Sequence, residues 1–422
     1  MSYAITWGPL ALSLSFLTGC TTVVQLPPGA PRGLPSFFAD KAPPPPDPAP
    51  AEARRQRVQA AVPEIARVIR EELEKSQVPN AAFGLVLDDK LLHAEGLGAL
   101  SDQGGQVTSA SVFRIGSISK VMTGLALLLL RDEGRLGLDD PAERYLPELK
   151  DAVYPTRDSP LITLRHLVTH SSGLPRLGSL DYGDAHLVSE RELTAAAHGA
   201  RLDFVPGTST KYSNLAMALA GLVVSRVSGQ PERAFLTRRL FTPLGMRSTV
   251  WEDAQVPAGL LAQGHSRDKE GRYQPCGPHW RLGPAEGMGG VYSSVDDLAR
   301  FISFELAAWP PRDDADDGPV RRATLRESQF GAGLSRAGKS TWGVNWAVSE
   351  DPTLGHVITH NGGTEGYSSS IWLAPGKGVG LVLLSSVSSV LDNLGKRALG
   401  MLVKAEKAPP PPAAPPPQAL LD

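Results

Sequence analysis

The chain has almost no excess charge of either sign. Its 42 Lys and Arg residues balance 44 Asp and Glu residues, which gives a formal net charge of -2 and an isoelectric point near 6.5. Without a basic excess, binding to nucleic acid is not expected. A content of 41% hydrophobic and 20% charged residues over 422 positions predicts a globular protein with a large core, arranged as two domains or as one with an insertion.

Several motifs that carry chemistry in other proteins are absent. No Gly-x-Ser-x-Gly occurs, which argues against an α/β-hydrolase, and no glycine-rich phosphate-binding motif occurs either. His166 and His170 have the spacing of a metal pair, but no third ligand accompanies them, so a packed structural loop is the favoured interpretation. We therefore expect no metal and no cofactor.

Long hydrophobic runs are also missing, and the apolar stretch 4–17 is too short to cross about 30 Å of hydrocarbon. It leads into Leu17-Thr18-Gly19-Cys20, which resembles a bacterial lipobox with Cys20 as the lipidated residue. The favoured prediction is a signal peptide over 1–20 and an exported, periplasmic lipoprotein on a bacterial membrane, with the outer membrane as first choice. A plain cleaved signal or an uncleaved leader stays open, because no Lys or Arg precedes the run. If Cys20 is acylated, Cys276 has no disulfide partner.

Proline is concentrated at the two ends of the chain. Residues 21–50 and 407–422 are rich in Pro and Ala, and such segments favour extended conformations that bury little surface. We interpret them as a tether and a tail. The folded part then covers roughly 51–406.

The periodicity of apolar residues predicts strands and helices at both ends of this folded part. A helix over 51–73 is followed by a hairpin of 82–87 with 91–95, and a second hairpin of 370–373 with 379–384 precedes a helix over 387–404. We expect one sheet domain made of 51–130 and 291–406. The Pro- and Gly-punctuated middle, 131–290, is predicted to be an inserted, mainly helical lobe.

Ser117 and Lys120 begin a strongly apolar helix predicted to end near Gly134. If Ser117 opens this helix, Lys120 lies one turn further on the same face, where its amine can reach the hydroxyl. A second Ser-x-x-Lys, Ser266 to Lys269, lies in a polar stretch and is interpreted as a surface loop.

Two further motifs follow in the chain. Tyr212 and Asn214 are two residues apart at the entrance of a predicted helix, so a phenol and a carboxamide can face one site. His360-Asn361-Gly362-Gly363 follows an apolar run and is predicted on an edge strand, where glycine lets a partner approach the backbone.

In this order, the three motifs resemble the serine β-lactamase and penicillin-recognising D,D-peptidase superfamily. The resemblance lies on the side that includes class C β-lactamases, D,D-carboxypeptidases, esterases of this fold and D-aminopeptidases, and it covers about 60–405. The stretches 167–175, 244–246 and 289–294 are similar to further landmarks of the superfamily. The resemblance implies an α+β, three-layer α/β/α fold of the β-lactamase/transpeptidase type, with a central antiparallel sheet flanked by helices.

The resemblance also implies roles for the motif residues. Ser117 would be the nucleophile that forms an acyl-enzyme, Lys120 would hold or take its proton, and Tyr212 would act as general base and return the proton to the leaving group. Because lysine and tyrosine normally titrate near about 10.4 and about 10, we expect at least one pKa to be lowered, with the Lys120 cation favouring the Tyr212 phenolate.

The same resemblance implies the binding groups. The backbone N–H groups of Ser117 and Gly363 would form the oxyanion hole. Four more residues are expected to contact the substrate: Asn214, His360, Asn361 and Gly362.

His360 stands where many β-lactamases carry the lysine of a Lys-Thr-Gly motif, which this chain lacks. The sequence therefore predicts a serine hydrolase acting on an ester or on a peptide of the D-amino-acid or cell-wall type. A class C-like β-lactamase and a non-catalytic, lipid-tethered protein that binds peptides or a partner remain alternatives. Substrate choice is expected to depend on the loops 176–205 and 252–288.

Overall fold

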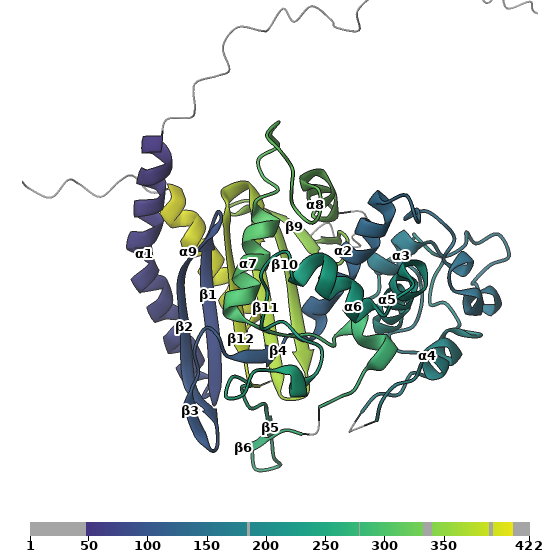
Figure 1. Ribbon diagram of the computed structural model, residues 1–422, viewed down its shortest axis with the longest axis horizontal. Helices are drawn as coiled ribbons and strands as arrows, with labels where there is room; N and C mark the ends of the chain where they lie inside the picture. Colours follow the sequence, from purple (N-terminus) through teal and green to yellow (C-terminus); the bar gives the residue numbers. More distant parts are fainter. Residues whose placement is uncertain (1–47, 184–185, 278, 332–339, 388–390, 408–422) are drawn as a thin grey trace, which may run out of the picture. The chain divides into compact units, whose positions relative to one another are not determined.

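Strands from both ends of the folded chain share one sheet, as predicted (Figure 1). The structure is a computed structural model that describes residues 48–407 except 184–185, 278, 332–339 and 388–390. Cys20, most of the predicted tether and nearly all of the predicted tail lie outside the described residues. In the part of the chain that is described, no helix combines the length and the apolar character that a membrane span requires.

Within the described residues, eight strands form an antiparallel sheet in the order β3-β2-β1-β12-β11-β10-β9-β8. Two short pairs, β4 with β7 and β5 with β6, lie outside it. The strands are β1 Asn80–Leu87, β2 Lys90–Ser101, β3 Gly104–Gln106, β4 Val112–Arg114, β5 His265–Arg267, β6 Tyr273–Pro275, β7 Tyr292–Ser294, β8 Thr341–Trp342, β9 Ala347–Asp351, β10 Gly355–Thr364, β11 Tyr367–Ala374 and β12 Val379–Ser385.

The bounds of the two terminal helices differ from the prediction. The first helix is longer than the predicted 51–73, and the last begins later than the predicted 387. The first starts at Pro48, because proline is tolerated in the first helical turn, and the last runs from Asp392 to Lys407. The α-helices are α1 Pro48–Lys75, α2 Ser119–Asp132, α3 Leu164–Val168, α4 Glu190–Ala197, α5 Asn214–Ser228, α6 Glu232–Leu236, α7 Val295–Leu306, α8 Arg322–Ser328 and α9 Asp392–Lys407.

The two faces of the sheet bury different side chains of the same strand. Along β1, Phe83 and Leu85 pack in the hydrophobic cluster shared with α1 and α9, whereas Ala82 and Val86 belong to the cluster shared with α7 and α2. Successive strand residues point to opposite faces, so a strand buried on both sides must be apolar throughout. This sorting confirms the predicted α/β/α layers.

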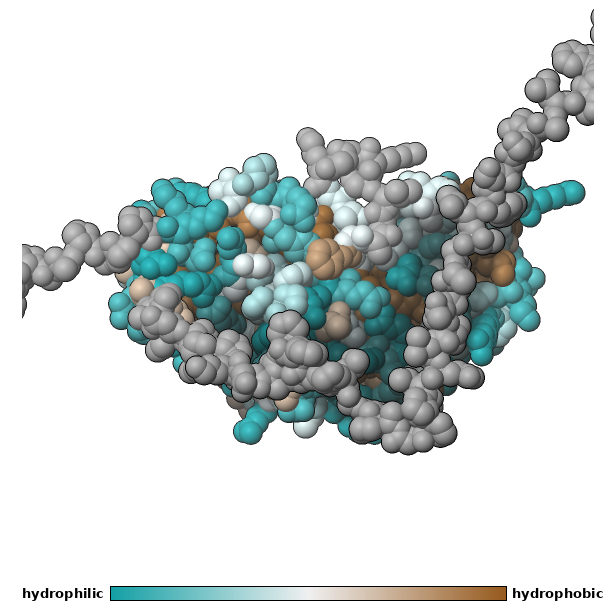
Figure 2. All heavy atoms as spheres, turned by 90° about the horizontal axis from the view of Figure 1, so that it is seen from above, coloured by the Kyte–Doolittle hydropathy of each residue, from teal (hydrophilic) through white to brown (hydrophobic). Residues whose placement is uncertain are grey.

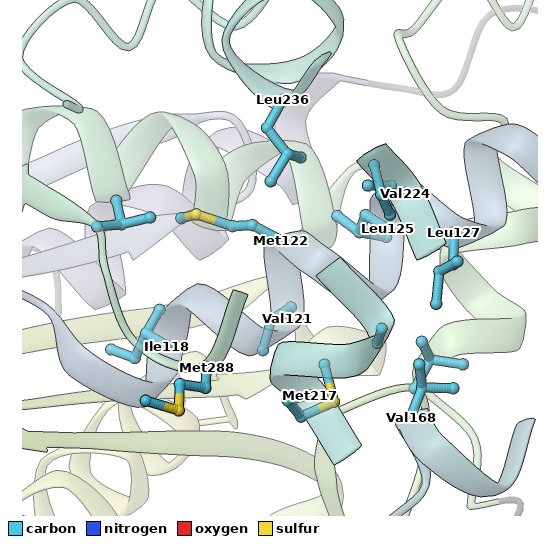
Figure 3. Close-up of a cluster of buried hydrophobic side chains, with 14 of the residues drawn as sticks. Ile118, Val121, Met122, Leu125, Leu127, Val168, Met217, Val224, Leu236 and Met288 are labelled. Carbon is cyan, nitrogen blue, oxygen red and sulfur yellow. The ribbon is translucent and has the colours of Figure 1, made fainter. Parts of the chain in front are cut away.

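The helix α2 lies inside the larger cluster. Every residue from Ser119 to Leu130 is buried, and Figure 3 shows Val121, Met122 and Leu125 of α2 among side chains of α5 and α6. Truncating a buried leucine to alanine typically costs about 2–5 kcal/mol, so this helix is held rigidly by packing. A rigid helix is a firm support for the residues at its N-terminal end.

Hydrophilic side chains cover much of the face seen in Figure 2, with apolar side chains between them.

The segment 131–290 contributes α3 to α6 and the β5–β6 pair but no strand of the eight-stranded sheet. Its separation as an inserted lobe stays a prediction. All of these elements belong to the unit that begins at Ala49.

Candidate active site

Ser117 lies in a short 3-10 turn, η1, which covers Gly116–Ile118 between β4 and α2. The sequence predicted that Ser117 itself opens the long helix, but α2 begins two residues later at Ser119. Residues Gly116–Ile118 form the 3-10 turn, in which Gly116 has a left-handed φ of 50°, so the α-helical pattern begins only at Ser119. Lys120 still follows Ser117 within one turn.

The turn that carries Ser117 is fixed from three sides. The Ile115 N–H donates to the Val291 carbonyl at 3.0 Å, beside the β4–β7 pair. The Ser369 hydroxyl of β11 donates to the Ile115 carbonyl at 2.7 Å, and the Ser119 hydroxyl donates to the Gly116 carbonyl at 2.7 Å. Hydrogen bonds from separate elements therefore hold the nucleophile candidate in one position.

Glycines bring the turn into contact with the strand that carries the third motif. A Cβ atom placed on Gly116 would lie 2.8 Å from the Gly363 nitrogen, and one on Gly362 would lie 1.9 Å from the Ile115 carbonyl oxygen. Side chains cannot be accommodated at such distances. The structure thus places Gly363 beside the Ser117 turn, where the sequence predicted the second oxyanion-hole donor.

This contact gives a matched pair of glycine substitutions. We expect Gly362→Ala to lower the free energy of unfolding by about 1–3 kcal/mol or more, because its methyl group would overlap backbone at Ile115. Gly363→Ala is the control, because a Cβ there meets no atom within 4 Å. Urea denaturation of both variants measures the difference, and equal stabilities would contradict the close packing described here.

Lys120 is fully buried and contacts the hydroxyl of Ser117. Its ammonium nitrogen lies 2.9 Å from Ser117 Oγ and also donates to the carbonyl of Met288, at the end of the 3-10 turn η6 (Gly283–Met288). Burial, together with the nearby Arg176 charge, holds the pKa of Lys120 well below its usual value. The neutral amine, which can accept a proton, is therefore accessible nearer to neutral pH.

Tyr212 approaches the same pair from the segment before α5. Lys120 Nζ lies 5.0 Å from the centre of its ring, and its hydroxyl forms a hydrogen bond with Ser117. Burial raises the pKa of Tyr212, an effect that exceeds the lowering by this hydrogen bond and by Arg176. The expectation that Lys120 would favour the Tyr212 phenolate was wrong, because desolvation outweighs the nearby positive charge.

His360 is buried at the point where β10 loses one neighbour. β9 pairs with β10 only up to Thr359 in the described residues, so the predicted edge holds for His360–Thr364 although β10 as a whole is an interior strand. The imidazole Nδ1 lies 2.7 Å from the Asn361 carbonyl oxygen, and burial, followed by the effect of Lys120, lowers the pKa of His360 to about 3. His360 is therefore a neutral side chain at physiological pH.

Comparison with known proteins assigns this arrangement to a family. The Beta-lactamase family model matches residues 65–403, most of the chain. The chain belongs to the Beta-lactamase family. Its Ser-x-x-Lys, Tyr-x-Asn and His-x-Gly segments all lie within the matched region.

Other members of the Beta-lactamase fold resemble the chain at moderate identity. A penicillin-binding protein homologue from Pyrococcus abyssi, described as octameric, is 26% identical with a TM-score of 0.71, over 82% of this chain and 78% of its own. A Beta-Lactamase/D-Alanine Carboxypeptidase from Pseudomonas syringae is 21% identical with a TM-score of 0.63, over 82% and 100%, which shows the shared fold.

Curated relatives are longer than the region of similarity. Protein flp of Staphylococcus aureus (strain COL) is 26% identical over 77% of this chain. Beta-lactamase-like protein 2 of Dictyostelium discoideum is 28% identical over 70%. The chain spans 63% of the first relative's length and 53% of the second.

The structure does not bring Asn361 to the Ser117 side of the Beta-lactamase sheet. Its side-chain oxygen accepts a hydrogen bond from Ser370 at 2.9 Å, and the Trp372 indole, which packs in the α1–α9 cluster, also donates to Ser370. The alternation of β10 puts Asn361 on the face opposite His360 and Gly362. The Asn361 side chain therefore points away from Ser117, and the predicted role of Asn361 in substrate binding is not supported by the position of this side chain.

Asn214 remains a binding candidate. It is the first residue of α5 and is 8% exposed, and its Oδ1 has no hydrogen-bond partner in the part of the chain that is described. A buried, unpaired amide oxygen is unfavourable, so an N–H group of a bound molecule would satisfy it.

Three ring contacts, made by His170 and Trp342, were not predicted from the sequence. His170 is fully buried with its ring centre 4.4 Å from that of Tyr212, and Trp342 of β8 lies 4.6 Å from His170 and 5.8 Å from His360. His170 lies in the stretch 167–175, which resembles a landmark of the superfamily, but its contact with Tyr212 could not be predicted from that stretch. Trp342 belongs to none of the motifs found in the sequence.

The competing candidates from the sequence, His166 and the second Ser-x-x-Lys, lie outside the site around Ser117. His166 accepts the Thr163 N–H at the start of α3, as a packed loop residue would. Ser266 is exposed on β5 and Lys269 is exposed after it, so the second Ser-x-x-Lys lies on the surface.

Proposed function

We propose that the protein is a serine hydrolase that forms an acyl-enzyme on Ser117 and acts on an ester or a peptide. The observation that carries this proposal is the 2.9 Å contact between Ser117 Oγ and the buried Lys120 amine, whose pKa is well below its usual value. Membership of a family of serine hydrolases supports the same chemistry.

In the acylation step, Ser117 Oγ attacks the substrate carbonyl carbon and its proton passes to the neutral Lys120 amine. The oxyanion that forms is stabilised by the N–H groups of Ser117 and Gly363. The proton then passes through the Tyr212 hydroxyl to the leaving group, whose bond to the carbonyl carbon breaks. Of the two groups, Lys120 is more easily available in its proton-accepting form near neutral pH, since burial lowers its pKa and raises that of Tyr212.

Deacylation runs the same transfers in reverse. Water attacks the acyl carbonyl, Lys120 receives the water proton directly or through Tyr212, and Ser117 Oγ is reprotonated as the acid leaves. No metal or redox partner is needed to balance these steps.

The neutral state of His360 favours an ester or peptide over a β-lactam. With a pKa near 3, its imidazole supplies no permanent charge at the position where many β-lactamases carry the Lys-Thr-Gly lysine. A purely binding role is disfavoured because the hydroxyl, the amine and the phenol converge on one another.

Intact-mass spectrometry tests the proposal. We expect a stoichiometric adduct after treatment with a fluorophosphonate or a slowly hydrolysed aryl ester, mapped to the peptide that contains Ser117, and hydrolysis of p-nitrophenyl esters or D-Ala-D-Ala peptides faster than of nitrocefin. Ser117→Ala should abolish the adduct. Ser266→Ala, from the second Ser-x-x-Lys, is the matched control and should label as the wild type does.

Two results would reject parts of this proposal. An adduct that persists in Ser117→Ala would remove the assigned nucleophile. Nitrocefin turnover faster than that of every ester and peptide would replace the proposed substrate class by β-lactams.

A further inference from the structure

We infer that Arg176 selects substrates whose leaving group carries a carboxylate, an inference that rests on the proposed acyl-enzyme function. Arg176 follows the stretch 167–175 and begins the first loop predicted to hold specificity. Its side chain is exposed, and its guanidinium carbon lies 5.5 Å from the centre of the Tyr212 ring. It therefore presents a permanent charge beside the residue that hands a proton to the leaving group.

The backbone of Arg176 is anchored, which fixes where its side chain starts. Its carbonyl accepts N–H groups from Asn214 at 2.8 Å and Leu215 at 3.1 Å, at the beginning of α5. The Ser213 hydroxyl donates to the preceding carbonyl of Pro175 at 2.8 Å. The loop and the Tyr-x-Asn segment are thus one hydrogen-bonded unit, and Arg176 keeps its position relative to Tyr212.

In the part of the chain that the structure describes, no carboxylate pairs with the charge of Arg176. Across the described residues, its guanidinium forms no ion pair and no hydrogen bond. By contrast, Lys211 on the same segment is paired with Asp203 at 2.6 Å. An exposed arginine that stacks on a tyrosine while its N–H groups stay free can bind a carboxylate with two parallel hydrogen bonds.

The other cationic candidates at the site are unsuitable. Lys120 is buried and already bound to Ser117 and the Met288 carbonyl. His360 is 4% exposed and neutral. Among the described residues around Ser117, Arg176 is therefore the cation that can bind a carboxylate of the substrate.

The position of Tyr212 indicates which part of the substrate Arg176 faces. Because Tyr212 delivers the proton to the departing atom, a cation over its ring lies on the leaving-group side. The substrate class is an ester or amide that releases an anionic alcohol or amine component, such as a hydroxy acid or an amino acid.

A matched pair of esters tests the inference. m-Carboxyphenyl acetate and m-carbamoylphenyl acetate have the same acyl group and leaving groups of similar size, and they differ in charge. For Arg176→Gln we expect kcat/KM for the carboxylate ester to fall about 10- to 100-fold, the loss typical of one charged hydrogen-bonded contact, with a change under about threefold for the neutral ester. Arg176→Lys should recover part of the loss.

The wild-type preference for the charged ester should also weaken as ionic strength rises, since the contact is exposed. Arg191→Gln, an exposed arginine on α4, is the control and should leave the preference unchanged. An equal loss on both esters would show that Arg176 only supports Tyr212, and no loss on either would show no role; both results overturn the inference.

Product binding separates this inference from the proposed function. Calorimetry should detect m-hydroxybenzoate binding that is at least about tenfold weaker in Arg176→Gln, and no such difference for m-hydroxybenzamide. Failure of the acyl-enzyme would appear as hydrolysis that persists in Ser117→Ala. Failure of the Arg176 assignment would appear as m-hydroxybenzoate binding that is unchanged in Arg176→Gln, whatever the catalytic result.

Discussion

Replacing Lys120 with methionine is expected to reduce kcat/KM for ester hydrolysis by about 10³-fold or more. Methionine fills the buried space of the lysine stem but supplies no amine to take the Ser117 proton at 2.9 Å. The loss should fall mainly on kcat, since Lys120 contacts the reacting hydroxyl and not the exposed part of the substrate. Stopped-flow and steady-state assays with an aryl ester measure both constants.

The pH dependence of the wild type provides the accompanying test. The neutral amine is the active form, so kcat/KM should rise with pH through the pKa of Lys120, at a pH well below its ordinary value of 10.5. Lys120→Arg should be as inactive as Lys120→Met, because a guanidinium stays protonated. Activity in either variant within about tenfold of the wild type would contradict the role of Lys120 as base.

Ser117 and Lys120 were predictable as a pair because they lie close together in the sequence. Ser117 and Lys120 are three residues apart, so helical periodicity alone brings them into contact, and the structure confirms this at 2.9 Å. The hairpins β1–β2 and β11–β12 were predictable for the same reason, since short turns and apolar runs define them.

Features that depend on long-range contacts were not predictable. The Met288 carbonyl that binds Lys120 lies 168 residues away, and Trp342 reaches His170 and His360 only through tertiary packing. The pKa of Tyr212 was misjudged because the sequence shows the nearby cation and not the desolvation. The orientation of Asn361 depends on strand register, which places it opposite Ser370.

Two buried carboxyl groups should make the protein less stable as the pH rises. Burial raises the pKa of Glu305 to about 8 and that of Glu232 to about 8, although Gln329 donates to the first and Thr123 to the second. In the unfolded chain these groups titrate near 4.5. Between the two pKa values the folded state binds more protons than the unfolded state, so the free energy of unfolding decreases with pH.

The stability that these protonated groups contribute is complete below about pH 4.5 and is lost progressively up to about pH 8. Between its unfolded and folded pKa values, each of these groups lowers the free energy of unfolding by about 1.4 kcal/mol per pH unit. Between pH 5 and pH 9, we expect urea denaturation of the wild type to give its lowest free energy of unfolding near pH 9. Glu305→Gln and Glu232→Gln should each flatten this dependence, because glutamine resembles the protonated acid and does not ionise.

The comparison of pH 5 with pH 9 separates ionisation from altered packing. A packing defect would lower the stability of the Gln variants equally at both values, whereas ionisation predicts near equality with the wild type at pH 5 and higher stability of the variants at pH 9. Glu74→Gln, an exposed carboxyl on α1, is the control and should leave the slope unchanged. If the wild type loses no stability between pH 5 and 8, these two carboxyls are solvated in the folded protein, and their assigned burial is wrong.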